Sequence, residues 1–98
     1  MAWTVAKEDF KGNAIEVLEG EFYLTDVDVL YNSNYHVIKY LDPYGDTTFN
    51  SLMFDDLIND LKDLKQKISI NTDQIDKIIK LVINSKSEVH IFIKFYGD

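Results

Sequence analysis

Catalytic chemistry in this sequence would have to begin with its two histidines, His36 and His90. Nucleophilic catalysis pairs such a base with a Ser, Thr or Cys. The chain has no Cys, and none of its five serines lies in a Gly-x-Ser-x-Gly turn. Both histidines fall in segments that the sequence predicts to be strands. We therefore expect no catalytic residues and no enzymatic activity.

Metal binding is the second chemistry to consider. If the two histidine-bearing segments were neighbours, their imidazoles could share a transition metal with Asp28 or Glu88. The ligand spacing is not that of a dedicated site, and the Asp26-x-Asp28 pair is not a calcium loop because Leu30 takes the third ligand position. A glycine-rich phosphate loop is also missing from the sequence. We expect no metal and no cofactor.

The charge of the chain and its distribution exclude further functional classes, namely nucleic-acid-binding and membrane proteins. The 98 residues include ten Lys, no Arg and seventeen acids, for a net charge of −7. Such a chain repels nucleic acid, whose binding depends on Lys and Arg. The longest uncharged run, residues 29–38, is far shorter than the ~18–20 apolar residues of a membrane span. Charge also appears by Lys7, which is unlike a secretory signal, so we expect a cytoplasmic protein without a membrane partner.

The negative charge is concentrated in the first half of the chain. Residues 1–49 carry nine acids and three lysines, whereas residues 50–98 carry eight acids and seven lysines. The acids of the first half are interspersed with Phe22, Tyr23, Tyr31, Tyr35, Tyr40 and Tyr44. Tyrosine offers a large contact area with a hydroxyl, and carboxylates steer the approach of cations. The mixture is typical of a surface that binds a basic protein, although strand tyrosines and solubilising acids would give the same pattern.

Nine residues are the predicted partner-binding residues. They are Glu19, Glu21, Asp26, Asp28, Tyr31, Tyr35, Asp42, Tyr44 and Asp46.

The first half reads as strands and turns. Residues 14–18 predict a short strand between two glycines, and residues 21–31 alternate acid and apolar positions as a half-wetted strand does. Residues 35–41 are rich in β-branched and aromatic types and predict a third strand. They are followed by Asp42-Pro43-Tyr44-Gly45-Asp46, whose Pro and Gly suit a type I turn.

The second half predicts two helices and a strand. Apolar residues recur every three or four positions from Leu52 to Ile68, Asn50 is a plausible N-cap, and the paired acids of this helix, Asp60 among them, are assigned to its solvated face. A second helix begins near Asn71, with Gln74 completing a possible capping box. Residues 88–96 alternate cleanly and predict the last strand.

The resulting order is β-β-β-α-α-β within a single domain, residues 1–98. It predicts an α+β fold, a mostly antiparallel sheet with two helices on one face. Because the last strand is reached through two helices, we also consider that it lies parallel to an earlier strand.

Two short motifs resemble those of a group of small bacterial proteins, largely uncharacterised. One is Phe49-Asn50 at the start of the first predicted helix, and the other is the terminal Phe95-Tyr96-Gly97-Asp98. Members of that group begin their helix with an aromatic-Asn pair and end on a Phe-x-Gly-Asp strand. The resemblance covers about a third of the chain, roughly residues 47–64 and 88–98. It implies a bacterial or phage domain and no catalytic residues.

The sequence thus favours a small acidic protein that neutralises a basic partner, as an immunity protein neutralises a toxin or an inhibitor a defence protein. The alternative is a homo-oligomeric structural or accessory domain, a homodimer for example, in which the C-terminal strand pairs with its copy. Phe92 and Tyr96 motivate that alternative, because they make the strand apolar on both faces.

Overall fold

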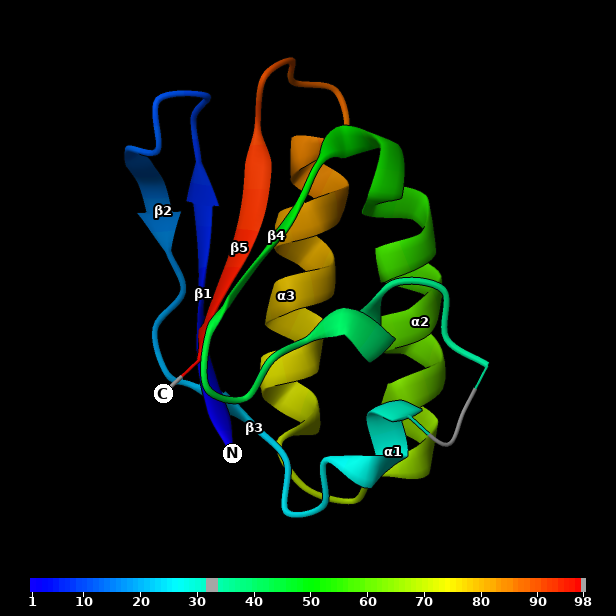
Figure 1. The fold of residues 1–98 in the computed structure, drawn as a ribbon. Coiled ribbons are helices and arrows are strands. Elements are labelled where there is room, and N and C mark those ends of the chain that lie inside the picture. Colours follow the sequence, from blue (N-terminus) through cyan, green and yellow to red (C-terminus); the bar gives the residue numbers. More distant parts are fainter. Residues whose placement is uncertain (32–33, 98) are drawn as a thin grey trace.

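The protein folds into two layers, an antiparallel sheet and a pair of helices that cover one of its faces (Figure 1). The computed structural model describes residues 1–31 and 34–97. The strands are β1 (Ala2–Glu8), β2 (Ala14–Val17), β3 (Phe22–Tyr23), β4 (Asp46–Phe49) and β5 (Phe92–Gly97). The helices are α1 (Asp28–Tyr31), α2 (Phe54–Lys67) and α3 (Thr72–Ser85), with 3-10 turns at Ile38–Tyr40 and Ser51–Met53. The predicted α+β class is confirmed.

The first and last strands of the chain lie side by side in the middle of the sheet. Its order is β2-β1-β5-β4, and β3 continues the edge beyond β2 by pairing with the first residues of β1. All of these pairings are antiparallel. The register of β1 and β5 runs from the pair Trp3–Gly97 to the pair Glu8–Phe92. No strand is predicted at residues 2–8 from sequence patterning, so this central strand is found only in the structure.

Alternate side chains of the two central strands form the inner face of the sheet. Trp3, Val5, Ile93 and Phe95 are fully buried there, as the two-residue period of a strand requires. Trp3 stacks on Phe22 with ring centroids 5.4 Å apart, and Phe22 meets Phe95 edge to face at 6.2 Å. Aromatic pairs of this kind contribute about 0.5–1.5 kcal/mol beyond their buried area. These rings therefore join β1, β3 and β5 in one core.

The two long helices bury most of the apolar stripes that the sequence predicts, although Leu52, where the first stripe is predicted to begin, is 90 % exposed. The buried residues of these stripes are Leu57, Leu61, Leu64, Ile75, Ile78, Ile79 and Val82. Asn50, predicted to cap the helix itself, caps the short 3-10 turn Ser51–Met53 that leads into α2. Its side-chain oxygen accepts a hydrogen bond from the Leu52 amide at 3.0 Å.

The strand predicted at residues 35–41 is wrong. The backbone amides of His36, Val37 and Ile38 donate to the carboxylate of Asp60 on α2. Because these donors are already taken, the segment cannot join a sheet. It instead passes into the 3-10 turn Ile38–Tyr40, which packs against α2.

The strand predicted at residues 21–31 is mostly wrong as well. Only Phe22 and Tyr23 pair with β1, and the chain then turns into α1. Asp26 sets this turn, because its Oδ1 accepts the Asp28 amide at 2.9 Å. An alternation of only four residues, as at residues 26–29, is compatible with one helical turn as well as with a short strand. In the structure, Leu30 of the helical turn α1 is buried.

The last strand differs from its prediction in extent and direction. It begins at Phe92 rather than at residue 88, since His90 takes a left-handed backbone conformation with φ of 58°. It runs antiparallel to both neighbours, so the parallel arrangement is wrong. Two helices of opposite direction return the chain to the end of the sheet where β4 stops, and the next strand must then run the opposite way (Figure 1).

This topology also affects the predicted homodimer. β5 is paired along one edge with β1 and along the other with β4. Its backbone donors and acceptors are therefore used within the sheet, and it cannot pair with a copy of itself. An interface formed by pairing of the C-terminal strand is wrong for this reason.

We expect Gly97→Ala to destabilise the fold by at least about 2 kcal/mol, because overpacking that meets backbone atoms is hard to relax. A Cβ at this position would lie 2.5 Å from the carbonyl oxygens of both Asp42 and Gly45. The measurement is thermal unfolding by circular dichroism. Gly12→Ala is the comparison, since its Cβ meets nothing within 4 Å and only its φ of +84° costs about 1 kcal/mol. Equal losses in the two variants would contradict the close approach at Gly97.

Candidate functional site

Six of the nine predicted partner-binding residues are carboxylates, and the segments that carry them lie at one end of the molecule, the lower end in Figure 1. We call this region the acidic end. Its carboxylates are Glu19, Glu21, Asp26, Asp28, Asp42 and Asp46, and all six are exposed. They come from three segments: the link between β2 and β3, the approach to α1 with its first residue Asp28, and the turn before β4 with its first residue Asp46.

The link between β2 and β3 is held by the first turn of α3. Gln74 Nε2 donates to the carbonyl oxygens of Glu19 and Gly20 at 3.2 and 3.3 Å. Asn71 donates to the Glu21 carbonyl at 3.3 Å and accepts the Tyr23 amide at 2.8 Å. The capping box predicted for Asn71 and Gln74 is therefore wrong, because both side chains hold this link instead. They fix its backbone and leave the Glu19 and Glu21 carboxylates facing solvent.

The turn before β4 is held by the two central strands. The indole of Trp3 donates to the Asp42 carbonyl at 2.9 Å, and the Gly97 amide donates to the Gly45 carbonyl at 2.8 Å. Within the turn, Asp42 Oδ1 accepts the Tyr44 amide at 2.9 Å. Among the described residues, Asp46 is the one carboxylate of the acidic end that joins an ion pair, with Lys94 at 3.9 Å.

The three predicted tyrosines have different surroundings. Tyr44 is 77 % exposed, and Tyr31 is about half exposed, with its hydroxyl donating to the Leu41 carbonyl at 3.3 Å. Tyr35 is only 4 % exposed, so its ring belongs to the core and cannot supply contact area to a partner. The structure adds exposed rings at Tyr23 and Tyr40. Tyr23 could have been found from its position between two apolar residues, Phe22 and Leu24, because alternation directs it outward.

A cavity of about 450 Å³ opens at the acidic end. It lies between the segment that joins β3 to α1 and the connection from α2 to α3. Its apolar walls are Leu24, Val29, Ile68 and Ile70, and its charged lining residues are Asp26 and Lys67. We call it the end pocket. The sequence gives no sign of it, because its two walls are some forty residues apart.

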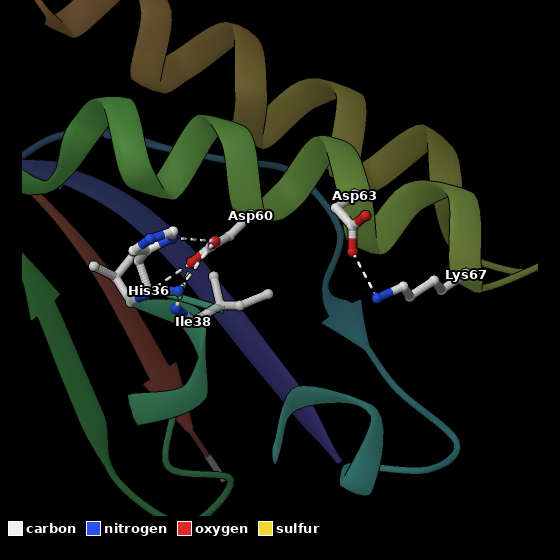
Figure 2. A network of polar contacts seen from close by, with 6 residues as sticks. His36, Ile38, Asp60, Asp63 and Lys67 are labelled. Atoms are coloured by element: carbon white, nitrogen blue, oxygen red, sulfur yellow. Dashed lines mark hydrogen bonds and ion pairs between the residues drawn. The ribbon is translucent and has the colours of Figure 1, made fainter. Parts of the chain in front are cut away.

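A buried carboxylate lies further along α2. Asp60 is 4 % exposed, and its oxygens accept the amides of Val37 and Ile38 at 2.8 and 3.1 Å (Figure 2). The His36 amide donates at 3.2 Å, and the His36 ring nitrogen Nδ1 lies 3.7 Å from the same carboxylate. The prediction that Asp60 lies on a solvated face is wrong. Its charge is buried because backbone donors replace the water that it loses.

Asp63 and Lys67 form an ion pair one turn apart on the same helix (Figure 2). The ammonium lies 2.8 Å from Asp63 Oδ2 and 5.1 Å from the centroid of the Tyr35 ring. The hydrogen bond from Lys67 lowers the pKa of the Asp63 carboxyl, and the Tyr35 hydroxyl lowers it further. The same hydrogen bond raises the pKa of Lys67. Both groups therefore stay charged at neutral pH.

The histidines are not brought together. His36 lies beside Asp60, whereas the His90 ring lies edge to face with Phe10, with centroids 5.9 Å apart. Within residues 1–31 and 34–97, no three His, Asp or Glu side chains are grouped closely enough to hold a metal ion.

In the same part of the chain, no helix is both long and apolar enough to cross a membrane.

Comparison with protein families, with curated proteins and with solved structures found no match to this chain.

We expect Asp60→Asn to lower the free energy of unfolding by about 1–3 kcal/mol, since a buried acceptor of several amides is replaced by a group with one acceptor oxygen. Urea unfolding measures this loss. Asp55→Asn is the control, because its side chain is exposed and its ion pair with Lys86 is worth at most about 1 kcal/mol. Equal losses would show that the Asp60 hydrogen bonds contribute little.

We also expect Lys67→Gln to raise the pKa of Asp63 toward its ordinary value, because Lys67 is the largest cause of the lowering. A group whose folded-state pKa is lowered stabilises the fold above its unfolded pKa and loses that effect as the pH falls through the folded pKa. The stability difference between wild type and Asp63→Asn should therefore be present at pH 7 and close in acid. Carboxyl ¹³C NMR titration checks the first statement, and urea unfolding at several pH values checks the second. An Asp63 that titrates identically with and without Lys67 would contradict it.

Proposed function

We propose that this chain is a small acidic cytoplasmic binding protein that neutralises a basic partner protein. An immunity protein that blocks a bacterial toxin and an inhibitor that blocks a defence protein are the two forms this function takes. The observation that carries the proposal is the acidic end, where six exposed carboxylates are presented by three segments, two of which are held by hydrogen bonds from Trp3 of β1 and from the start of α3.

The distribution of ion pairs supports this choice of surface. Away from the acidic end, the carboxylates of Asp55 and Glu88 contact the ammonium groups of Lys86 and Lys7. These charges largely cancel one another. The excess negative charge therefore acts mainly from the acidic end, where it would attract a cationic surface and raise the association rate.

Fixed backbones favour binding as well. A partner that meets a mobile loop must order it, which lowers the affinity. Here the turn that carries Asp42 and Tyr44 is already tied to Trp3 and Gly97. Exposed rings such as Tyr44 and Tyr23 add contact area beside the carboxylates. In the proposed mechanism, the acidic end covers the cationic residues with which the partner binds its own substrate.

The homo-oligomeric accessory domain is the second candidate, and two surfaces bear on it. The outer face of the sheet carries polar contacts, since the Tyr96 hydroxyl contacts Glu8 and Lys94 lies 4.7 Å over the Tyr96 ring. The β2 edge exposes Ile15 and Val17, but a bulge interrupts its register with β1. Bulges of this kind discourage pairing between sheet edges. A stable dimer of the purified chain in light scattering would favour this candidate over the first.

The test of the first candidate begins with affinity purification of the tagged chain from its native cell, with the product of the neighbouring gene examined first. Association with the purified partner is then measured by stopped flow at increasing NaCl. We expect the on-rate to fall steeply with salt, because exposed charges are screened beyond about 8–10 Å at physiological ionic strength. An on-rate that ignores salt would contradict the electrostatic mechanism.

Charge variants test which part of the protein surface determines the association rate. The double variant Glu19→Gln, Glu21→Gln should slow association at low salt by about threefold or more, as loss of steering charges does. The matched control is Asp55→Asn, Asp56→Asn, which removes the same charge at the start of α2, at the other end of the molecule (Figure 1). Equal slowing in both would show that only net charge matters and that the acidic end is not the contact surface.

A further inference from the structure

The end pocket has the walls of a site for a long aliphatic stem. Leu24 and Val29 line it from the side of α1, and Ile68 and Ile70 line it from the connection between α2 and α3. Its volume of about 450 Å³ is within the range of about 300–1,000 Å³ typical of small-molecule sites. Ile70 remains 40 % exposed, so part of this apolar surface would be covered only when the pocket is filled.

The polar groups around these walls favour a cation. Asp26 brings a carboxylate that is fixed by the Asp28 amide. The α2 helix ends at Lys67, and the last four carbonyl groups of a helix have no partner within the helix. They form the negative end of the helix dipole, equivalent to about half a charge. A carboxylate and a helix C-terminus thus bear on the same cavity.

Lys67 also lines the pocket, and its charge would oppose a second cation. Its ammonium, however, lies 2.8 Å from the Asp63 carboxylate and over the ring of Tyr35. The ion pair leaves little net charge from these two residues at a distance. Asp26 and the end of α2 therefore determine the sign of the potential in the cavity.

We infer that the end pocket receives an arginine side chain of the basic partner. The three methylene groups of the side chain would lie between the walls of Leu24 and Ile68, and the guanidinium would meet Asp26 and the carbonyl end of α2. Tyr23, which also lines the cavity and is 42 % exposed, offers its ring to the flat guanidinium. This inference rests on the proposed function and names the side chain with which that partner would be anchored.

The first test uses a small probe and needs no partner. Uniformly ¹⁵N-labelled protein is titrated with N-acetyl-L-arginine amide and, separately, with N-acetyl-L-citrulline amide, the neutral isostere. We expect weak, saturable shifts in the amide signals of residues 23–29 and 67–70, with citrulline binding about two- to fivefold more weakly, the range for one exposed charge contact. No saturable shift at these residues, or equal affinity for the two probes, would overturn the inference.

Variants then separate the pocket from general electrostatics. Asp26→Asn keeps an oxygen that can accept a hydrogen bond from the Asp28 amide. The substitution should lower the affinity for arginine amide by about two- to fivefold. Asp9→Asn is the matched control, because Asp9 Oδ1 accepts the Lys11 amide at 2.9 Å in the same way, outside the pocket and the acidic end. Its affinity for the probe should be that of the wild type. An unchanged affinity in Asp26→Asn, or an equal loss in Asp9→Asn, would overturn the assignment.

The variant Lys67→Gln should change the affinity for arginine amide in the opposite direction. It removes the opposing ammonium from the pocket lining and leaves the charge of Asp63, one helical turn away, without its ion pair to Lys67, so arginine amide should bind more tightly by about two- to fivefold. Weaker binding would overturn the inference, since it would mean that Lys67 itself holds the probe.

Failure of the arginine inference can be distinguished from failure of the proposed function. Salt-dependent association with a basic partner, without arginine amide in the pocket, would overturn this inference and leave the proposed function in place. Salt-independent association with the partner would contradict the electrostatic mechanism of the proposed function, whereas the probe titration would still report on the pocket.

Discussion

Pairing of the first strand with the last is the constraint on which the rest of the structure depends. β1 and β5 form the middle of the sheet, and their inward rings, Trp3 and Phe95, anchor its core. The same two strands support part of the acidic end, because Trp3 and Gly97 each donate a hydrogen bond to the turn before β4. Loss of this pairing would remove the core and the support of the acidic end together.

Polar side chains of the two long helices hold the segments that are neither helix nor strand. Asp60 binds the amides of residues 36–38, and Asn71 and Gln74 bind the link between β2 and β3. Buried or half-buried backbone groups need such partners. The helices therefore do more than supply an apolar stripe, since they determine the path of the chain that carries the predicted binding residues.

The charge distribution follows from the same architecture. Lys86 contacts Asp55 near the start of α2 and Lys7 contacts Glu88 before β5, whereas among the described residues the acidic end joins one ion pair, that of Asp46 with Lys94. A protein that kept its excess charge only for solubility would have no need to gather it on segments fixed by hydrogen bonds. The proposed function would explain both features, and under the further inference the end pocket would receive an anchoring side chain of the partner.

The sequence by itself determined the class of the fold, because the stripes of α2 and α3 and the alternation in β5 are periodic over many residues. It also determined where the acids are concentrated along the chain. Tertiary structure decided what short patterns could not. Residues 35–41 lie outside the sheet because the carboxylate of Asp60 on α2 accepts hydrogen bonds from three of their amides. The side chains of Asn71 and Gln74 bind the link between β2 and β3 instead of capping α3. The burial of Tyr35 and the end pocket were likewise decided by tertiary structure, because both arise from contacts between residues distant in sequence.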